Sequence, residues 1–134
     1  MKAPLLDTHA WVWWVAGSDR LDRRTLNRLD RLPASQRPLV SAISLWEAAM
    51  LVALGRLALR TSFDAWIARA AAPATIEILP ITPEVAMEVA RLPDTCHRDP
   101  ADRIIVATAR VHQLPVVTLD RAMLDSKLVR GWTL

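Results

Sequence analysis

The chain has 134 residues, of which 52% are hydrophobic and 23% are charged, and this composition predicts one compact globular domain over residues 1–134. It contains no charge block, internal repeat or Gly/Ser-rich linker, which excludes a disordered or fibrous protein. Cys96 is the only cysteine, so an intramolecular disulfide and a thiolate zinc cluster are also excluded.

The N-terminal segment and the net charge restrict location and partners. Asp7 and His9 interrupt the first apolar stretch, and no apolar run approaches the ~20 residues of a membrane span, so we expect a cytoplasmic protein that does not enter a membrane. The net charge is +3, but fifteen of the seventeen basic residues are Arg, which suits bidentate phosphate contacts. A GC-rich genome explains the same bias equally well. The charge therefore permits a nucleic-acid partner without establishing one.

Strand and helix signals alternate along the chain. Short apolar runs predict strands at residues 4–7, 39–43, 76–81 and 114–119, with a short last strand at 129–133. Apolar periodicity, caps and breakers predict helices at 8–17, 22–32, 44–57, after Ser62, from Thr82 to 92, and from Asp99 to 112. Short strands joined by helices favour right-handed crossovers. The predicted fold class is α/β, with a mostly parallel sheet flanked by helices on both faces.

Four acidic residues fall where this sheet would bind a ligand. In open parallel sheets, ligands bind beyond the carboxyl ends of the strands, where the strand order switches. The four acids near such ends are Asp7, Glu47, Asp102 and Asp120. Clustered carboxylates raise one another's pKa values, so their gathering makes sense mainly with a cation between them. Ligands that are all oxygen favour Mg²⁺ or Mn²⁺ over zinc.

Each acid also has a purely structural interpretation. Asp7 and Asp120 are good N-caps for the helices that follow them. The sequence Ser44-Leu45-Trp46-Glu47 matches a capping box, in which Glu47 would bond back to the Ser44 N–H. In "RDPADRIIVATA", Asp99 can cap the helix, which leaves Asp102 in the first turn, where it would gain only the helix-dipole interaction.

Histidine and tryptophan residues give weaker signals. The three histidines, His9, His97 and His112, show no spacing that suggests a catalytic pair, so we expect structural or solvated roles for them. Arg98 and Arg103 flank Asp102 and are candidates for phosphate steering, although Arg103 fits a solvated helix surface better. The helix over 8–17 carries Trp11, Trp13 and Trp14, and at least two of them are expected to be buried.

Four separated motifs together resemble the PIN-domain ribonucleases of the VapC toxin type. They are "LLDTHAWVWW", "SAISLWEAAMLVALGRL", "HRDPADRIIVATA" and "VVTLD", and they cover the whole chain in the family's order. The resemblance places the family's four acids on Asp7, Glu47, Asp102 and Asp120. Asp99, Arg98 and Thr118 are further candidates outside this core set.

The resemblance implies a PIN fold and an endoribonuclease that depends on Mg²⁺ or Mn²⁺, with RNA as its substrate. It also implies a homodimeric toxin that a cognate VapB-like antitoxin neutralises. With one or two such ions, water attacks phosphorus, so cleavage would leave a 5′-phosphate and a 3′-hydroxyl. A noncatalytic PIN-like binding module is the alternative, because a fold does not guarantee its function.

Overall fold

All five strands of the structure lie in one parallel sheet. The structure is a computed structural model that describes residues 3–94, 96 and 99–132. Across the sheet the strand order is β3-β2-β1-β4-β5, and every neighbouring pair is parallel. The strands are short: β1 Leu5–Leu6, β2 Leu39–Ser41, β3 Glu77–Leu79, β4 Pro115–Val117 and β5 Arg130–Gly131. The predicted mostly parallel sheet is confirmed.

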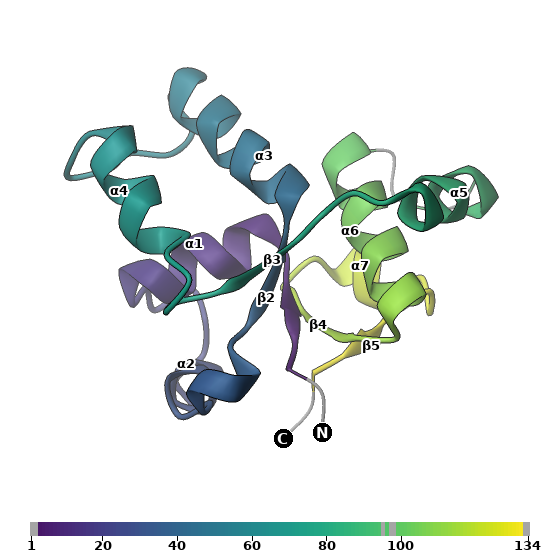
Figure 1. The fold of residues 1–134 in the computed structure, drawn as a ribbon, viewed down its shortest axis with the longest axis horizontal. Helices are drawn as coiled ribbons and strands as arrows, with labels where there is room; N and C mark the ends of the chain where they lie inside the picture. Colours follow the sequence, from purple (N-terminus) through teal and green to yellow (C-terminus); the bar gives the residue numbers. More distant parts are fainter. Residues whose placement is uncertain (1–2, 95, 97–98, 133–134) are drawn as a thin grey trace.

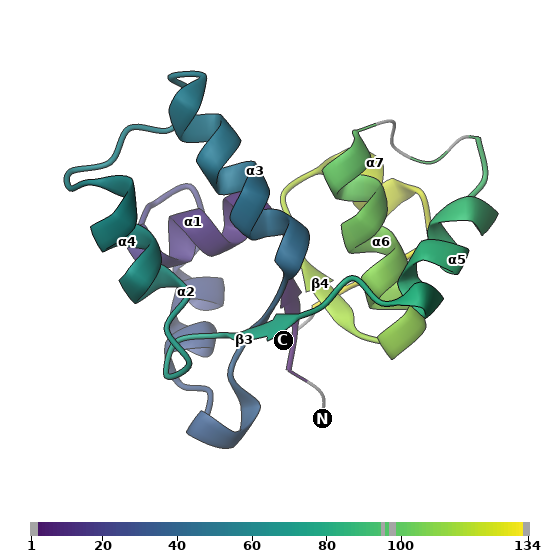
Figure 2. The same ribbon diagram turned by 45° about the horizontal axis from the view of Figure 1, so that its top comes forward.

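Helices cover both faces of the sheet, as predicted. Figures 1 and 2 show α1 to α4 on one side and α5 to α7 on the other. The first group is α1 Thr8–Ala16, α2 Arg23–Asp30, α3 Ala42–Ala53 and α4 Phe63–Ala70, with a short 3₁₀ helix, η1, at Ala34–Gln36. The second group is α5 Pro83–Arg91, α6 Pro100–His112 and α7 Arg121–Asp125. None of the helices in the described residues is long and apolar enough to cross a membrane.

The strand order reverses between β1 and β4. From β1 the chain moves through α1 and α2 to β2 on one side, and from β4 it moves through α7 to β5 on the other. Leu5 pairs with Leu39 of β2 and also with Val116 of β4, so β1 is central. This reversal leaves a crevice at the carboxyl ends of β1 and β4, which is the usual ligand-binding position in open parallel sheets.

The sheet has an apolar cluster on each face. One cluster joins Leu6 and Val40 to buried residues of α1, α2 and α4. The other joins Leu5 and Val116 to buried residues of α5 and α6. Adjacent residues Leu5 and Leu6 therefore point to opposite faces, because side chains alternate along a strand. The short β1 is fixed by two cores, and its position fixes the residue that follows it, Asp7.

The tryptophans of α1 are less buried than expected. Trp11 is fully buried, and its indole N–H donates to the Ala70 carbonyl at 2.9 Å. Trp13 and Trp14 are only partly buried, and the Trp14 indole N–H donates to Asp30 at the surface. The prediction that at least two of the three would be buried was wrong, because Trp13 lines a pocket and Trp14 reaches Asp30 at the surface.

Element boundaries differ most from prediction around β2. The strand predicted over 39–43 ends at Ser41, where α3 begins at once at Ala42. The Ser41 hydroxyl accepts from the Ile43 N–H at 3.2 Å and is the N-cap. The helix predicted over 44–57 therefore begins two residues earlier and ends at Ala53. The last strand is limited to Arg130–Gly131, and residue 133 of its predicted range is outside the described residues.

Candidate functional site

One pocket at the carboxyl ends of β1 and β4 brings the predicted acids together. It has a volume of about 380 Å³. Its lining includes five carboxylates, from Asp7, Glu47, Asp99, Asp102 and Asp120. These side chains come from α1, α3, α6 and α7 or from the residues that cap them. The fold thus gathers all four core acids and Asp99 around the reversal of the strand order.

Asp7 is a helix cap and a pocket residue at the same time. It follows β1, and its Oδ1 accepts from the Ala10 N–H at 2.8 Å, which caps α1. Its Oδ2 accepts a hydrogen bond from the Thr118 hydroxyl. The side chain is only 7% exposed. The capping prediction is therefore confirmed, and it does not compete with a place in the pocket, because each carboxylate oxygen keeps a further lone pair.

Thr118 holds the two central strands together at the pocket. Besides bonding Asp7, its hydroxyl oxygen accepts from the Asp120 N–H at 3.0 Å. Asp120 in turn caps α7, since its Oδ1 accepts from the Ala122 and Met123 N–H groups at 2.9 and 3.3 Å. Thr118 is buried and connects the residue after β1 to the residue that begins α7. We assign it a positioning role for both acids.

Glu47 does not form the capping box that was its structural alternative. Ser44 is buried inside α3, while the cap is Ser41. Glu47 accepts instead from the hydroxyl of Thr8, which also lies 2.8 Å from the Ser44 hydroxyl oxygen. The early start of α3 explains the error, because it places residues 44 and 47 one turn inside the helix, facing α1. This contact directs the Glu47 carboxylate towards Asp7 and not towards its own backbone.

The two aspartates of "RDPADRIIVATA" have different places: Asp99 caps α6, and Asp102 lines the pocket without being the cap. Asp99 is the N-cap of α6, because its Oδ1 accepts from the Asp102 N–H at 3.1 Å, and Pro100 is the first helical residue. Asp102 lies in the first turn of α6 with its side chain partly buried. The cap is thus supplied without Asp102. Its carboxylate lines the pocket, which helix capping does not explain.

The gathered carboxylates destabilise one another's ionised forms. Burial raises the pKa of Asp7, against the lowering effect of the Thr118 and Ala10 hydrogen bonds, and the charge of Asp120 raises it further. Burial also raises the pKa of Glu47, the Thr8 hydrogen bond opposes this, and the charges of Asp99 and Asp7 add to it. Ionising these groups at neutral pH therefore costs folding free energy, which a bound cation would offset.

The carboxylates of this pocket suit a cation that keeps part of its water shell better than a metal ion enclosed by protein ligands. Within the described ranges, no three His, Cys, Asp or Glu side chains are close enough to hold one metal ion together. Mg²⁺ keeps several waters and usually takes only one or two carboxylates directly. A pocket lined by five carboxylates and open to water meets that requirement. Asp7 and Asp102 would be the direct ligands, with Glu47, Asp99 and Asp120 contributing through water.

Four residues that are not acidic complete the pocket lining: His9, Trp13, Arg20 and Leu119. Of these, the sequence drew attention to His9 and Trp13 but not to Arg20, which follows α1 in a turn and matches no motif. His112 ends α6 and does not line this pocket, nor does Arg103. The candidates His97 and Arg98 are outside the described residues.

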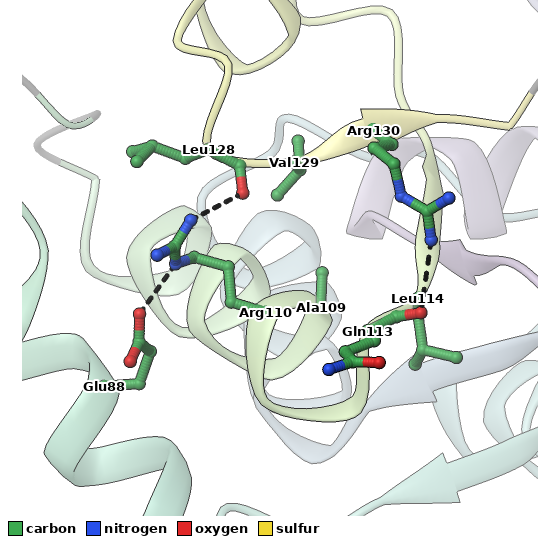
Figure 3. Close-up of a pocket in the computed structure, with 8 residues that line it drawn as sticks. All are labelled: Glu88, Ala109, Arg110, Gln113, Leu114, Leu128, Val129 and Arg130. Carbon is green, nitrogen blue, oxygen red and sulfur yellow. Dashed lines mark hydrogen bonds and ion pairs between the residues drawn. The ribbon is translucent and has the colours of Figure 1, made fainter.

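A second pocket, of about 570 Å³, lies at the amino ends of β4 and β5, which is the opposite edge of the sheet. Figure 3 shows its two arginines bonded within the protein. Arg110 donates to Glu88 at 2.7 Å and to the Leu128 carbonyl at 3.1 Å, and Arg130 reaches the Gln113 carbonyl at 3.4 Å. Although this pocket is larger, it contains one carboxylate and no cluster of reactive groups, so the acidic pocket is the candidate site.

The raised pKa of Glu47 predicts that Glu47→Gln stabilises the metal-free protein. The amide oxygen can still accept from Thr8, while the unfavourable charge is removed. Because the folded-state pKa lies above the unfolded one, the parent loses stability as the pH rises through about 4 and beyond. In EDTA at pH 7 we expect a gain of about 0.5–1 kcal/mol that vanishes below about pH 4. Urea unfolding across this pH range measures it.

Asp22→Asn is the matched control, because Asp22 is an exposed N-cap that accepts from the Thr25 N–H at 2.7 Å. That hydrogen bond lowers its pKa, so the ionised form contributes stability above the usual pKa and loses it as the pH falls. Asp22→Asn should cost a few tenths of a kcal/mol at pH 7. Equal losses in the two variants would contradict the electrostatic strain assigned to the pocket.

Comparisons with known proteins agree with this geometry. The family model for the PIN domain matches residues 5–127. The chain is 34% identical over 123 residues to Ribonuclease VapC22 of Mycobacterium tuberculosis, covering 92% of this chain and 91% of that protein.

Solved structures show the same fold. The crystal structure of FitAcB from Neisseria gonorrhoeae has a TM-score of 0.70 and 26% identity, over 96% of both chains. A structure of FitAB bound to an IR36 DNA fragment has a TM-score of 0.69 and 25% identity, covering 96% of this chain and 92% of that one. From the family model and the identity to a relative along nearly the whole chain, we conclude that this protein belongs to the PIN domain family.

Proposed function

We propose that this protein is a VapC-type ribonuclease toxin whose acidic pocket cleaves RNA with the help of Mg²⁺ or Mn²⁺. The observation that carries the proposal is the convergence of Asp7, Glu47, Asp102 and Asp120 in one pocket at the reversal of the strand order. The similarity to Ribonuclease VapC22 over 92% of the chain supports RNA as the substrate class. Residues 1–134 would act as one catalytic domain.

We assign different roles in catalysis to the residues of the pocket. Asp7 and Asp102 would hold the cation, Glu47 and Asp120 would bind its water shell, and Thr118 would keep Asp7 and Asp120 in position. When bound, the cation neutralises charge at the phosphate and activates water for attack at phosphorus, which leaves a 5′-phosphate and a 3′-hydroxyl. Thr8 would orient Glu47 through the hydroxyl that it donates.

The cleavage test uses variants that keep the backbone hydrogen bonds. Asp102→Asn removes a charge without removing a cap, because Asp99 caps α6. We expect this variant to fold normally and to lose cleavage of a labelled RNA in Mg²⁺ or Mn²⁺ by at least about 100-fold. Asp22→Asn, at an exposed cap away from the pocket, should cleave at the parental rate. Gel analysis of the products also reports their end groups.

A noncatalytic PIN-like module is the competing function, because a fold does not guarantee its function. Thermal unfolding with increasing Mn²⁺ separates the two, because an ion that binds the native state raises its stability. The nuclease proposal requires stabilisation that Asp102→Asn reduces. No response of the parent to Mn²⁺, together with no cleavage of RNA, would favour the module, whereas wild-type cleavage by Asp102→Asn would contradict the metal role of Asp102.

A cognate antitoxin is the partner that we propose, of the VapB-like type and covering the acidic pocket. The membership in the PIN family and the relation to VapC22 support this partner. Expression of the chain alone should arrest growth, and expression of an antitoxin encoded beside it should restore growth. Colony counts after induction measure both effects, with Asp102→Asn as the inactive control. Unchanged growth and intact RNA after induction of the parent would remove the basis for a toxin.

We also propose a homodimer, and α3 offers a surface for it. Trp46, Met50 and Leu54 follow one another at four-residue spacing and are 54%, 39% and 59% exposed. Glu47 is the only charged residue of α3, and it faces the pocket. An uncharged apolar stripe is self-complementary, as a two-fold contact between identical subunits requires. This favours a second copy of the chain as its occupant.

Trp46→Glu tests the dimer. A two-fold contact brings the new charges near each other, so this variant should have the mass of a monomer by light scattering at concentrations where the parent is dimeric. Ala34→Glu, in the exposed η1, adds the same charge away from α3 and should remain dimeric. A monomeric parent would contradict the dimer, and a parent that gains mass only with the antitoxin would assign the stripe to that partner.

A further inference from the structure

Another hollow adjoins the acidic pocket, and its charged lining residues are arginines. It has a volume of about 250 Å³ and shares three lining residues with the acidic pocket: His9, Trp13 and Arg20. On its far side it is lined by Arg56 and by apolar residues of α1, α3 and the segment after α3. We call the surface formed by His9, Trp13, Arg20 and Arg56 the arginine–aromatic groove. It continues directly from the carboxylates, so a bound chain can occupy both.

Two helix ends position the arginines. Gly17 ends α1 with a φ of 64°, and Gly55 follows α3 with a φ of 70°, a conformation that favours glycine. The chain reverses direction after each glycine. After Gly17 the Ser18 N–H donates to the Trp13 carbonyl at 2.9 Å, and after Gly55 the Arg56 N–H donates to the Leu51 carbonyl at 2.8 Å. These turns place Arg20 and Arg56 beside the exposed side of α1. The turns in "AGSDR" and "ALGR" thus bring Arg20 and Arg56 to the lining of the same hollow.

The aromatic residues of the groove lie one helical turn apart. His9 and Trp13 are at positions i and i+4 of α1, and their ring centroids are 5.5 Å apart. The Arg20 guanidinium lies 5.8 Å from the centroid of the Trp13 ring, in the range of a cation–π contact. His9 is exposed, whereas Trp13 is partly buried against the core. Trp13 therefore holds Arg20 and His9 side by side at the boundary of the two hollows.

Both arginines retain charge for a ligand. Among the residues that the structure describes, neither the Arg20 nor the Arg56 guanidinium makes an ion pair with a carboxylate. Arg110 in the other pocket contrasts with them, because Glu88 already binds it. A pocket lined by five carboxylates repels a polyanion, so a phosphate chain needs cations next to it. Arg20 and Arg56 are placed to supply them.

We propose that the arginine–aromatic groove binds single-stranded RNA beside the bond to be cut, with a base packed against His9 and Trp13 and phosphates on Arg20 and Arg56. This rests on the proposed ribonuclease function and extends it to a substrate subsite. Unstacked bases pack on aromatic or guanidinium planes, and arginines track the backbone, in proteins that bind single strands. A double helix does not present its bases in this way, which makes unpaired RNA the substrate form.

The test is direct binding of a short fluorescein-labelled single-stranded RNA, measured by anisotropy in EDTA at pH 8 over a range of salt concentrations. Each phosphate contact on a single strand contributes about 0.7 to the salt slope, which corresponds to about 5-fold in affinity at 0.1 M salt. Arg20→Gln and Arg56→Gln should each show that loss of affinity and slope. His9→Ala should lose about 5-fold or more with an unchanged slope, because it removes stacking and not charge.

Arg130→Gln is the matched control, because it removes the same charge at the amino end of β5, on the opposite edge of the sheet. It should bind RNA as the parent does. Trp13→Leu provides a second variant of the aromatic pair, with a thermal melt to verify its fold. The groove is overturned if Arg20→Gln and Arg56→Gln keep the parental affinity and slope, or lose no more than Arg130→Gln. Undetectable RNA binding by the parent overturns it too.

Two further results separate this proposal from the ribonuclease function itself. A parent that binds RNA through the groove but does not cleave it in Mg²⁺ or Mn²⁺ supports the groove and contradicts the nuclease. A parent that cleaves RNA, with groove variants that bind and cleave normally, supports the nuclease and overturns the groove. Groove variants that lose only the antitoxin, with unchanged RNA affinity, overturn it in favour of a protein ligand.

Discussion

The hydrogen bond between Thr118 and Asp7 is the contact on which the site depends. It joins the residues that follow β4 and β1, the two strands between which the strand order reverses. The bond is buried, so losing it would leave the Oδ2 of Asp7 without its hydrogen-bond donor. Because Thr118 also accepts from the Asp120 backbone, this one hydroxyl sets the spacing of two acids that are 113 positions apart in the chain.

Capping and ligand binding act together in this protein. Asp7, Asp99 and Asp120 each begin a helix, and the positive ends of three helix dipoles therefore face the acidic pocket. These dipoles reduce the cost of gathering carboxylates but do not remove it, since the pKa of Asp7 remains raised. The pocket gathers negative charge that a cation can neutralise, and the groove beside it places Arg20 and Arg56 where the proposal needs cations for the phosphates of a substrate.

Most of the fold and the set of acids could be predicted because they rest on local signals. Alternating apolar runs, and caps such as Asp99-Pro100, indicated the order of the elements and the parallel sheet. Glu47 was predicted for the site, but its alternative as part of a capping box was wrong, because Ser41 caps α3 and Ser44 contacts Thr8 instead. Arg20 and Arg56 gave no signal, since their place in the arginine–aromatic groove depends on two glycine turns and on the distance between helices.

The central claim is that the acidic pocket holds a divalent cation between carboxylates that otherwise repel one another. Crystals grown or soaked with Mn²⁺, and data collected at a wavelength where manganese scatters anomalously, test this most directly. The account predicts an anomalous peak in the pocket, within coordination distance of Asp7 or Asp102, that is missing in crystals of Asp102→Asn. A pocket without such a peak at saturating Mn²⁺, or a peak bound only elsewhere on the protein, would contradict it.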